Sequence, residues 1–188
     1  MAKLIAAINM TLDGFCDHTA GIPDEDLHQH YADLLKNADT ILYGRITYQL
    51  MEYWQTVVKN PTGNKAMDEF AVVIDKIPKI VFSQTLKDAN PVALGWDSAW
   101  LATRSLEEEA VALKKQPDKN ILVGSRSLII QLLKLNLIDE FQLCVHPVIE
   151  GHGLPLFENI NDRAILTLSK TKTFSSGAIV LYYEPKAG

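Results

Sequence analysis

The chain has few cysteines, and they are not arranged to form a disulfide framework or a structural metal site. Only Cys16 and Cys144 occur among the 188 residues, with no Cys-x-x-Cys pair and no cluster of histidines beside either one. Disulfide-stapled domains and zinc modules carry several cysteines at fixed spacings. We therefore expect no metal site.

Long apolar runs and an excess of basic charge are also missing. No stretch approaches the roughly 18 consecutive apolar residues that span a bilayer. The apolar segment after Lys3 is interrupted by Asn9 and followed by Asp13, which fits a first strand better than a signal peptide. Eighteen Lys and Arg against 23 Asp and Glu give a net charge of -5, which argues against a broad nucleic-acid surface. We expect a cytoplasmic protein that binds neither membranes nor nucleic acids.

The remaining composition is that of an ordinary globular protein. Apolar residues make up 47% and charged residues 22% of the chain, which excludes a disordered or coiled-coil protein. There is no internal repeat and no Gly/Ser/Pro-rich linker. We expect residues 1–188 to form one domain.

Short apolar runs alternate with stripes at helical spacing. Leu27, Tyr31 and Leu34 recur on one helix face behind a carboxylate-rich first turn. Ser105 and Glu108 fit a capping box at the start of another helix. A later helix is expected to bury Leu128, Leu132 and Leu135. The strand-like runs cover residues 4–8, 40–43, 79–83, 120–123, 140–149, 164–174 and 178–183.

This order predicts a fold class. Alternating strands and helices form a mainly parallel sheet, and the last two strand-like runs fit an antiparallel hairpin. We predict an α/β fold with three layers, α/β/α, in which a mostly parallel central sheet carries antiparallel C-terminal strands.

Three strand ends share a small or hydroxylated residue with a basic residue close by. In an open α/β sheet, ligands bind outside the carboxyl ends of the strands, where glycine, hydroxyls and arginine can hold phosphate. The pattern favours a phosphate-rich ligand such as a dinucleotide. The alternative is that the glycines are turn residues and the arginines are solvated, and no Gly-x-Gly-x-x-Gly or Walker motif is present. The segments are Gly44-Arg45-Ile46-Thr47, Ser83-Gln84-Thr85 and Gly124-Ser125-Arg126-Ser127.

Several segments, in order, resemble the dihydrofolate reductase-like superfamily. The final segments are especially similar to the C-terminal reductase domain of the riboflavin-pathway bifunctional protein. The resemblance covers nearly the whole chain and, with the strand-like runs, implies a sheet of about eight strands. The segments are Met10 to Phe15, Leu42 to Tyr48, Lys79 to Ser83, Ile121 to Ser125, Leu137 to Glu140, His146 to Ile149 and Gly151 to Phe157.

The resemblance implies NADPH as hydride donor and a homodimer. By it, Gly44, Arg45 and Thr47 bind the cofactor, the last two through its phosphates, and Ser83 lies at the adenosine 2′-phosphate. Gly124 and Ser125 would cradle the pyrophosphate. The backbone of Ala7 and the Asp13-Gly14 loop would border the nicotinamide. Arg126 departs from the Gly-Ser-Gly usual in the riboflavin branch, and we expect it to add a phosphate contact.

The substrate side is less defined. Folate reductases hold and protonate their substrate with an acidic residue early in the first helix, and Asp26 is the nearest match. The alternative is that Asp26 only favours the helix dipole. Val145 stands where the folate enzymes often have Thr, which argues against dihydrofolate as substrate. Two functions remain open: an NADPH-dependent reductase of a small heterocycle or carbonyl compound, such as the riboflavin-pathway pyrimidine, or a non-catalytic nucleotide- or drug-binding module.

Overall fold

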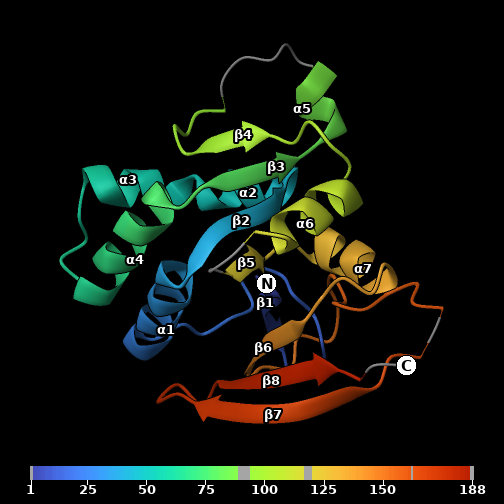
Figure 1. Ribbon diagram of the computed structural model, residues 1–188. Coiled ribbons are helices and arrows are strands. Elements are labelled where there is room, and N and C mark those ends of the chain that lie inside the picture. Colours follow the sequence, from blue (N-terminus) through green and yellow to red (C-terminus); the bar gives the residue numbers. More distant parts are fainter. Residues whose placement is uncertain (1, 89–93, 117–119, 162, 187–188) are drawn as a thin grey trace.

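The computed structural model describes residues 2–88, 94–116, 120–161 and 163–186, whose strands form one eight-stranded sheet (Figure 1). Neighbouring strands follow the order β4-β3-β2-β5-β1-β6-β8-β7. The strands are β1 (Leu4–Thr11), β2 (Ala38–Gly44), β3 (Lys79–Phe82), β4 (Ala99–Leu101), β5 (Asn120–Val123), β6 (Glu140–His146), β7 (Leu166–Thr173) and β8 (Ile179–Pro185).

The pairing confirms the predicted sheet. Along the sheet order, each neighbouring pair from β4 through β3, β2, β5 and β1 to β6 is parallel. β8 pairs antiparallel with both β6 and β7. The structure adds β4, which the sequence does not reveal because its three residues are too few to show an alternating or continuous apolar pattern.

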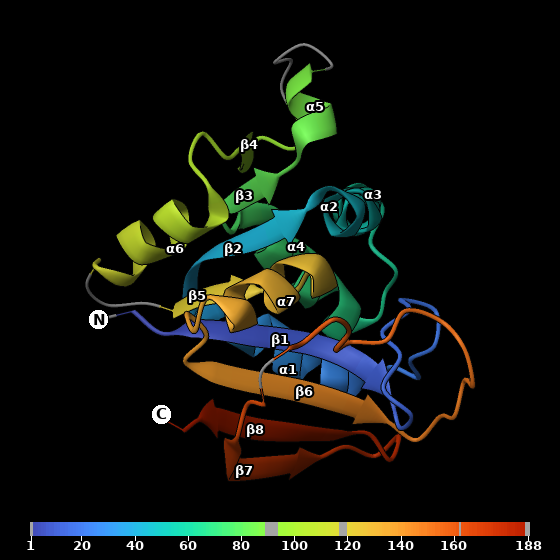
Figure 2. The ribbon, with the colours of Figure 1, turned by 90° about the vertical axis from the view of Figure 1, so that its right-hand side faces the viewer.

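Helices cover both faces of the sheet, which confirms the three-layer fold (Figures 1 and 2). On one face, α1 and α4 pack over Ile5, Ile41 and Leu122. On the other, α6 and α7 pack over Leu4 and Leu42. The helices are α1 (Glu25–Lys36), α2 (Arg45–Met51), α3 (Tyr53–Lys59), α4 (Lys65–Lys76), α5 (Gln84–Asp88), α6 (Leu106–Lys114) and α7 (Arg126–Lys134).

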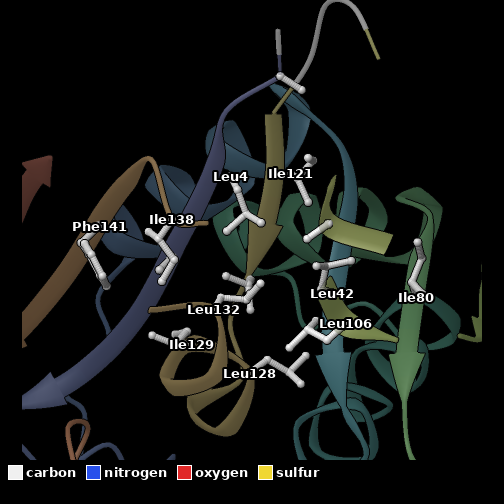
Figure 3. Packing of buried hydrophobic residues seen from close by; sticks show 14 of the residues in the cluster. Leu4, Leu42, Ile80, Leu106, Ile121, Leu128, Ile129, Leu132, Ile138 and Phe141 are labelled. Atoms are coloured by element: carbon white, nitrogen blue, oxygen red, sulfur yellow. The ribbon is translucent and has the colours of Figure 1, made fainter. Parts of the chain in front are cut away.

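The side chains of α7 show how the layers are held together. Leu128, Ile129 and Leu132 point into the cluster that contains Leu4 and Ile121 of the sheet (Figure 3). Each is at most 4% exposed. Burying a Leu or Ile side chain contributes roughly 1.5–3 kcal/mol, so this stripe fixes the helix against one face of the sheet.

Local capping signals mark the starts of α1 and α6. The carboxylate of Asp24 accepts a hydrogen bond from the Leu27 N–H at 2.7 Å, which places Asp24 at the N-cap of α1. Ser105 and Glu108 form the predicted capping box of α6. Two local expectations were wrong. Leu135 is 38% exposed because α7 ends at Lys134, and β6 ends at His146 because Pro147 has no N–H to donate to a neighbouring strand.

The carboxyl ends of β1, β2 and β6 lie at one end of the sheet (Figure 2). Two loops distant in sequence meet there, since Thr11–Asp17 contacts the segment after β6 through the hydrogen bonds Leu12 N–H to Val148 O and Cys16 N–H to Leu154 O. β1 pairs with β5 only as far as Ala6 but with β6 as far as Thr11. The sheet therefore opens between β1 and β5 at this end. Within the described ranges, no helix combines the length and apolar character needed to cross a membrane.

Candidate functional site

A cleft of about 490 Å³ lies at the carboxyl ends of β2 and β3 and extends to the segment after β4. Its lining contains two arginines, five hydroxyl side chains and no carboxylate. Such a surface favours an anion with several acceptor oxygens. The lining residues are Gly44, Arg45, Ile46, Thr47, Phe82, Ser83, Gln84, Thr85, Arg104, Ser105, Leu106, Ser127, Leu128 and Gln131.

Gly44 sits where β2 meets the start of α7. Its N–H donates a hydrogen bond to the Ser125 hydroxyl oxygen at 2.8 Å, and both residues are buried. A Cβ on Gly44 would lie 3.3 Å from the Ser127 hydroxyl oxygen, tighter than ordinary van der Waals contact. The lack of a side chain therefore lets the strand end and the helix start approach closely beside the cleft.

Arg45, Thr47 and Ser83 all line the cleft, as the strand-end pattern predicts. The Arg45 guanidinium donates to the Gln49 side-chain oxygen at 3.2 Å, and the ion pairs among the described residues do not include it. The Ser83 hydroxyl oxygen accepts from the Leu86 N–H at 3.1 Å, which leaves its own O–H able to donate. These donors can hold phosphate oxygens.

Arg104 is a cleft residue that the sequence reasoning missed. It follows β4 and precedes the Ser105 capping box, and its side chain is 56% exposed with a carboxylate oxygen of Glu109 at 3.9 Å. The signal was available, since a basic residue stands directly before a helix cap. By sequence alone Arg104 does not stand out as a strand-end residue, because the three residues of β4 are too few to show a strand.

Gly124 and Ser125 are not part of the cleft lining, and Ser125 contacts the lining residue Gly44. A Cβ on Gly124 would lie 3.5 Å from the backbone oxygen of Ala7 and 3.8 Å from the Tyr43 ring. The end of β5 thus lies against the backbone of β1 at Ala7, one residue past the last β1–β5 pair. Ser125 is 1% exposed and acts through its hydrogen bond with Gly44.

Asp13 and Gly14 join the two loops at the end of β1. The Asp13 carboxylate accepts hydrogen bonds from the Thr11 hydroxyl at 2.6 Å and the Gly151 N–H at 2.7 Å, which lower its pKa to about 2. Gly14 has a φ of 91°, a backbone conformation that favours glycine, and its carbonyl accepts from the Leu156 N–H at 2.8 Å. Both residues lie outside the lining of the cleft and hold the loops together.

Arg126 turns away from the cleft toward the same loop region. Its Nε donates to the Pro155 carbonyl at 2.5 Å, and its guanidinium pairs with a Glu158 carboxylate oxygen at 2.5 Å. These contacts hold the guanidinium against the segment after β6, and Arg126 is not among the residues that line the cleft.

The RibD C-terminal domain family matches residues 2–180. The chain belongs to this family. The uncharacterized protein YyaP of Bacillus subtilis (strain 168) is 36% identical over 185 residues, which cover 96% of this chain and 94% of YyaP.

Solved structures agree on the fold of this RibD C-terminal domain family member. A Shewanella sp. PV-4 protein named for riboflavin biosynthesis matches with a TM-score of 0.73 and 20% identity over the full length of both chains. Dihydrofolate reductase from Enterococcus faecalis, solved with NADP(H), matches with a TM-score of 0.61 and 15% identity over 98% of this chain and 97% of that one. At these identities the likeness concerns the fold, and it confirms the dihydrofolate reductase-like architecture.

Asp26 is not among the residues that line the cleft. It is exposed in the first turn of α1, and its nearest hydrogen-bonding neighbour is the Ser175 hydroxyl, 3.5 Å away in the turn between β7 and β8. Asp24 beside it caps the helix. The structure therefore does not bring Asp26 together with the residues that line the cleft.

Proposed function

We propose that the chain is an NADPH-dependent reductase that transfers a hydride to a small heterocyclic or carbonyl substrate. The observation that carries the proposal is the cleft at the strand ends, where Arg45, Arg104 and five hydroxyls face one another without a carboxylate in the lining. The best-matched activity is reduction of the riboflavin-pathway pyrimidine, 5-amino-6-(5-phosphoribosylamino)uracil, which the family resemblance supports.

The donor set of the cleft fits a phosphorylated dinucleotide. Arg45 and Thr47 would bind its phosphates, Ser83 would face the 2′-phosphate, and Gly44 allows close approach of the backbone. Gly124 and Ser125 would support the pyrophosphate side, with Ala7 and the Asp13-Gly14 loop toward the nicotinamide. When bound, NADPH supplies the hydride, and the chain orients cofactor and substrate at the open end of the sheet. A phosphate contact by Arg126 would require its pairing with Glu158 to break.

The rest of the proposal follows the family resemblance. Residues 1–188 would act as one reductase domain, in the cytoplasm and as a homodimer. Light scattering tests the assembly, since a mass near the 21.0 kDa of one chain at micromolar concentration would overturn the dimer.

Calorimetry with NADPH and NADH tests the cofactor assignment. We expect NADPH to bind about 10- to 100-fold more tightly, since a charge-assisted contact with the extra phosphate contributes about 1.5–3 kcal/mol. Arg45→Ala should weaken NADPH binding much more than NADH binding. Equal affinities for the two nucleotides, or no binding of either, would overturn the assignment.

A non-catalytic nucleotide- or drug-binding module is the second candidate. The position of Asp26, exposed and outside the cleft lining, favours it. NADPH oxidation against the pyrimidine, dihydrofolate, pterins, quinones and carbonyl compounds separates the two functions. Tight NADPH binding without turnover on any of them would favour the binding module. Where turnover is found, Asp26→Asn tests the acid: slower turnover with unchanged NADPH affinity supports it, and unchanged turnover removes it.

A further inference from the structure

Asn9 occupies an unusual place on β1. The strand lies between β5 and β6, yet the Asn9 side chain is exposed, because β5 pairing ends at Ala6 and β1 continues beyond it. A polar side chain exposed at the carboxyl end of a central strand faces the region where open α/β sheets bind ligands.

Two hydrogen bonds define which atom of the Asn9 amide is the oxygen. The Ile22 N–H donates to Nδ1 of His146 at 3.0 Å, so this nitrogen carries no proton. Burial lowers the pKa of His146, which favours the neutral ring with its proton on Nε2. Nε2 then donates to Oδ1 of Asn9 at 3.0 Å.

Tyr31 supplies the second donor to the same oxygen. Its hydroxyl lies 3.0 Å from Oδ1 of Asn9, and burial raises the pKa of Tyr31 so that the hydroxyl keeps its proton. Gly21 packs closely against the His146 ring, since a Cβ on Gly21 would lie 3.2 Å from Nε2. With Oδ1 filled by two donors, the amide Nδ2 group points its two N–H bonds elsewhere. Among residues 2–88, 94–116, 120–161 and 163–186, no hydrogen-bond partner of Nδ2 is found.

We infer that Asn9 binds the substrate by donating an amide N–H to an oxo oxygen of a heterocyclic or carbonyl compound. The inference rests on the proposed reductase function and adds a substrate-binding residue to it. Ala7 and Asn9 pair with Gln142 and Cys144 of β6, so they share one face of β1 two residues apart. The amide therefore lies beside the backbone that would border the nicotinamide, where the group that accepts the hydride must come.

Two pyrimidines of equal ring size test this donor. Uracil offers two oxo acceptors, and 2,4-diaminopyrimidine offers amino donors in their place. We expect calorimetry to show wild type binding uracil about three- to tenfold more tightly, the range of one net hydrogen bond. Asn9→Asp should reverse this preference, since one carboxylate oxygen still accepts from Tyr31 and His146 while the other replaces the amide donor. Asn60→Asp, an exposed change of the same charge at the end of α3, should keep the wild-type preference.

The outcomes separate this inference from the reductase proposal. Each titration is made with and without NADPH, and wild type is titrated with NADPH alone as a separate test of the reductase. Failure of NADPH to bind would overturn the reductase and leave the pyrimidine titration as a valid test of Asn9. Failure of wild type to bind uracil, or an unchanged preference in Asn9→Asp, would overturn the role of Asn9. Should Asn9→Asp not fold, Asn9→Ala serves instead, with loss of the uracil preference expected and its retention contradicting the inference.

Discussion

The Ser125 hydroxyl accepts a hydrogen bond from the Gly44 N–H at 2.8 Å and so joins the end of β2 to the start of α7. Ser125 is the N-cap residue of α7, yet its side chain makes no capping bond within the helix. The hydroxyl serves the neighbouring strand instead. This bond fixes the distance between two of the strand ends that we propose hold the cofactor.

Ser125→Ala should lower the free energy of unfolding by about 1–3 kcal/mol, because it leaves the buried Gly44 N–H without its acceptor. Urea denaturation followed by circular dichroism measures the change. Ser127→Ala, which removes a cleft hydroxyl with no hydrogen bond to Gly44, is the matched control and should leave stability within about 0.5 kcal/mol of wild type. Equal stabilities of the two variants would show that the Gly44–Ser125 bond contributes nothing.

Arg104→Ala should weaken NADPH binding by roughly three- to tenfold, less than a buried charged contact would, because the guanidinium is more than half exposed. Raising the salt concentration should shrink the difference. Fluorescence titration measures both effects. Lys134→Ala, at the far end of α7, removes the same charge without touching the cleft and should bind like wild type. An Arg104→Ala variant with wild-type affinity at low salt would remove Arg104 from the site.

His30→Phe should make the protein less sensitive to acid. The His30 ring is packed near Tyr31, Phe174 and Tyr182, and burial, assisted by Lys172, lowers its pKa to about 4 from an ordinary 6.5. Between these values the unfolded chain binds a proton that the folded chain does not, so stability falls as the pH drops from 6.5 toward 4.

Urea titrations at pH 7, 6, 5 and 4 should show a smaller loss of stability for His30→Phe than for wild type. His18→Gln, at an exposed position, should follow wild type. The same acid sensitivity in all three proteins would mean that His30 is protonated in the folded state as easily as in the unfolded chain.

Lys79→Met should flatten the alkaline side of the stability profile. Lys79 is fully buried, its ammonium lies 3.9 Å from the Trp96 ring centroid, and burial lowers its pKa to about 7 from 10.5. Above pH 7 the unfolded chain holds a proton that the folded chain has released, so wild-type stability should rise up to about pH 10. Denaturation at pH 7 to 10 measures this rise. Lys76→Met, on the exposed side of α4, should retain it, and a rise that persists in Lys79→Met would contradict the assignment.

The sequence by itself determined the layers, the parallel and antiparallel parts of the sheet and the start of α6, because periodicity and capping are properties of neighbouring residues. It also predicted that three strand ends contribute to one site, since the carboxyl ends of parallel strands meet at one edge of a sheet. Gly44, Arg45, Thr47 and Ser83 line one cleft there, whereas Gly124, Ser125 and Arg126 are not part of its lining.

Partners from distant segments were decided only by the tertiary structure. Arg126 has the sequence context of a phosphate ligand, but the fold brings Glu158 to its guanidinium. Asn9 is one polar residue in an apolar run, and its role follows from Tyr31 and His146, which lie 22 and 137 residues away in sequence. Such contacts depend on which strands become neighbours and where each one ends. Local patterns carry neither, because the free energy that selects strand order comes from packing the whole sheet between its two helix layers.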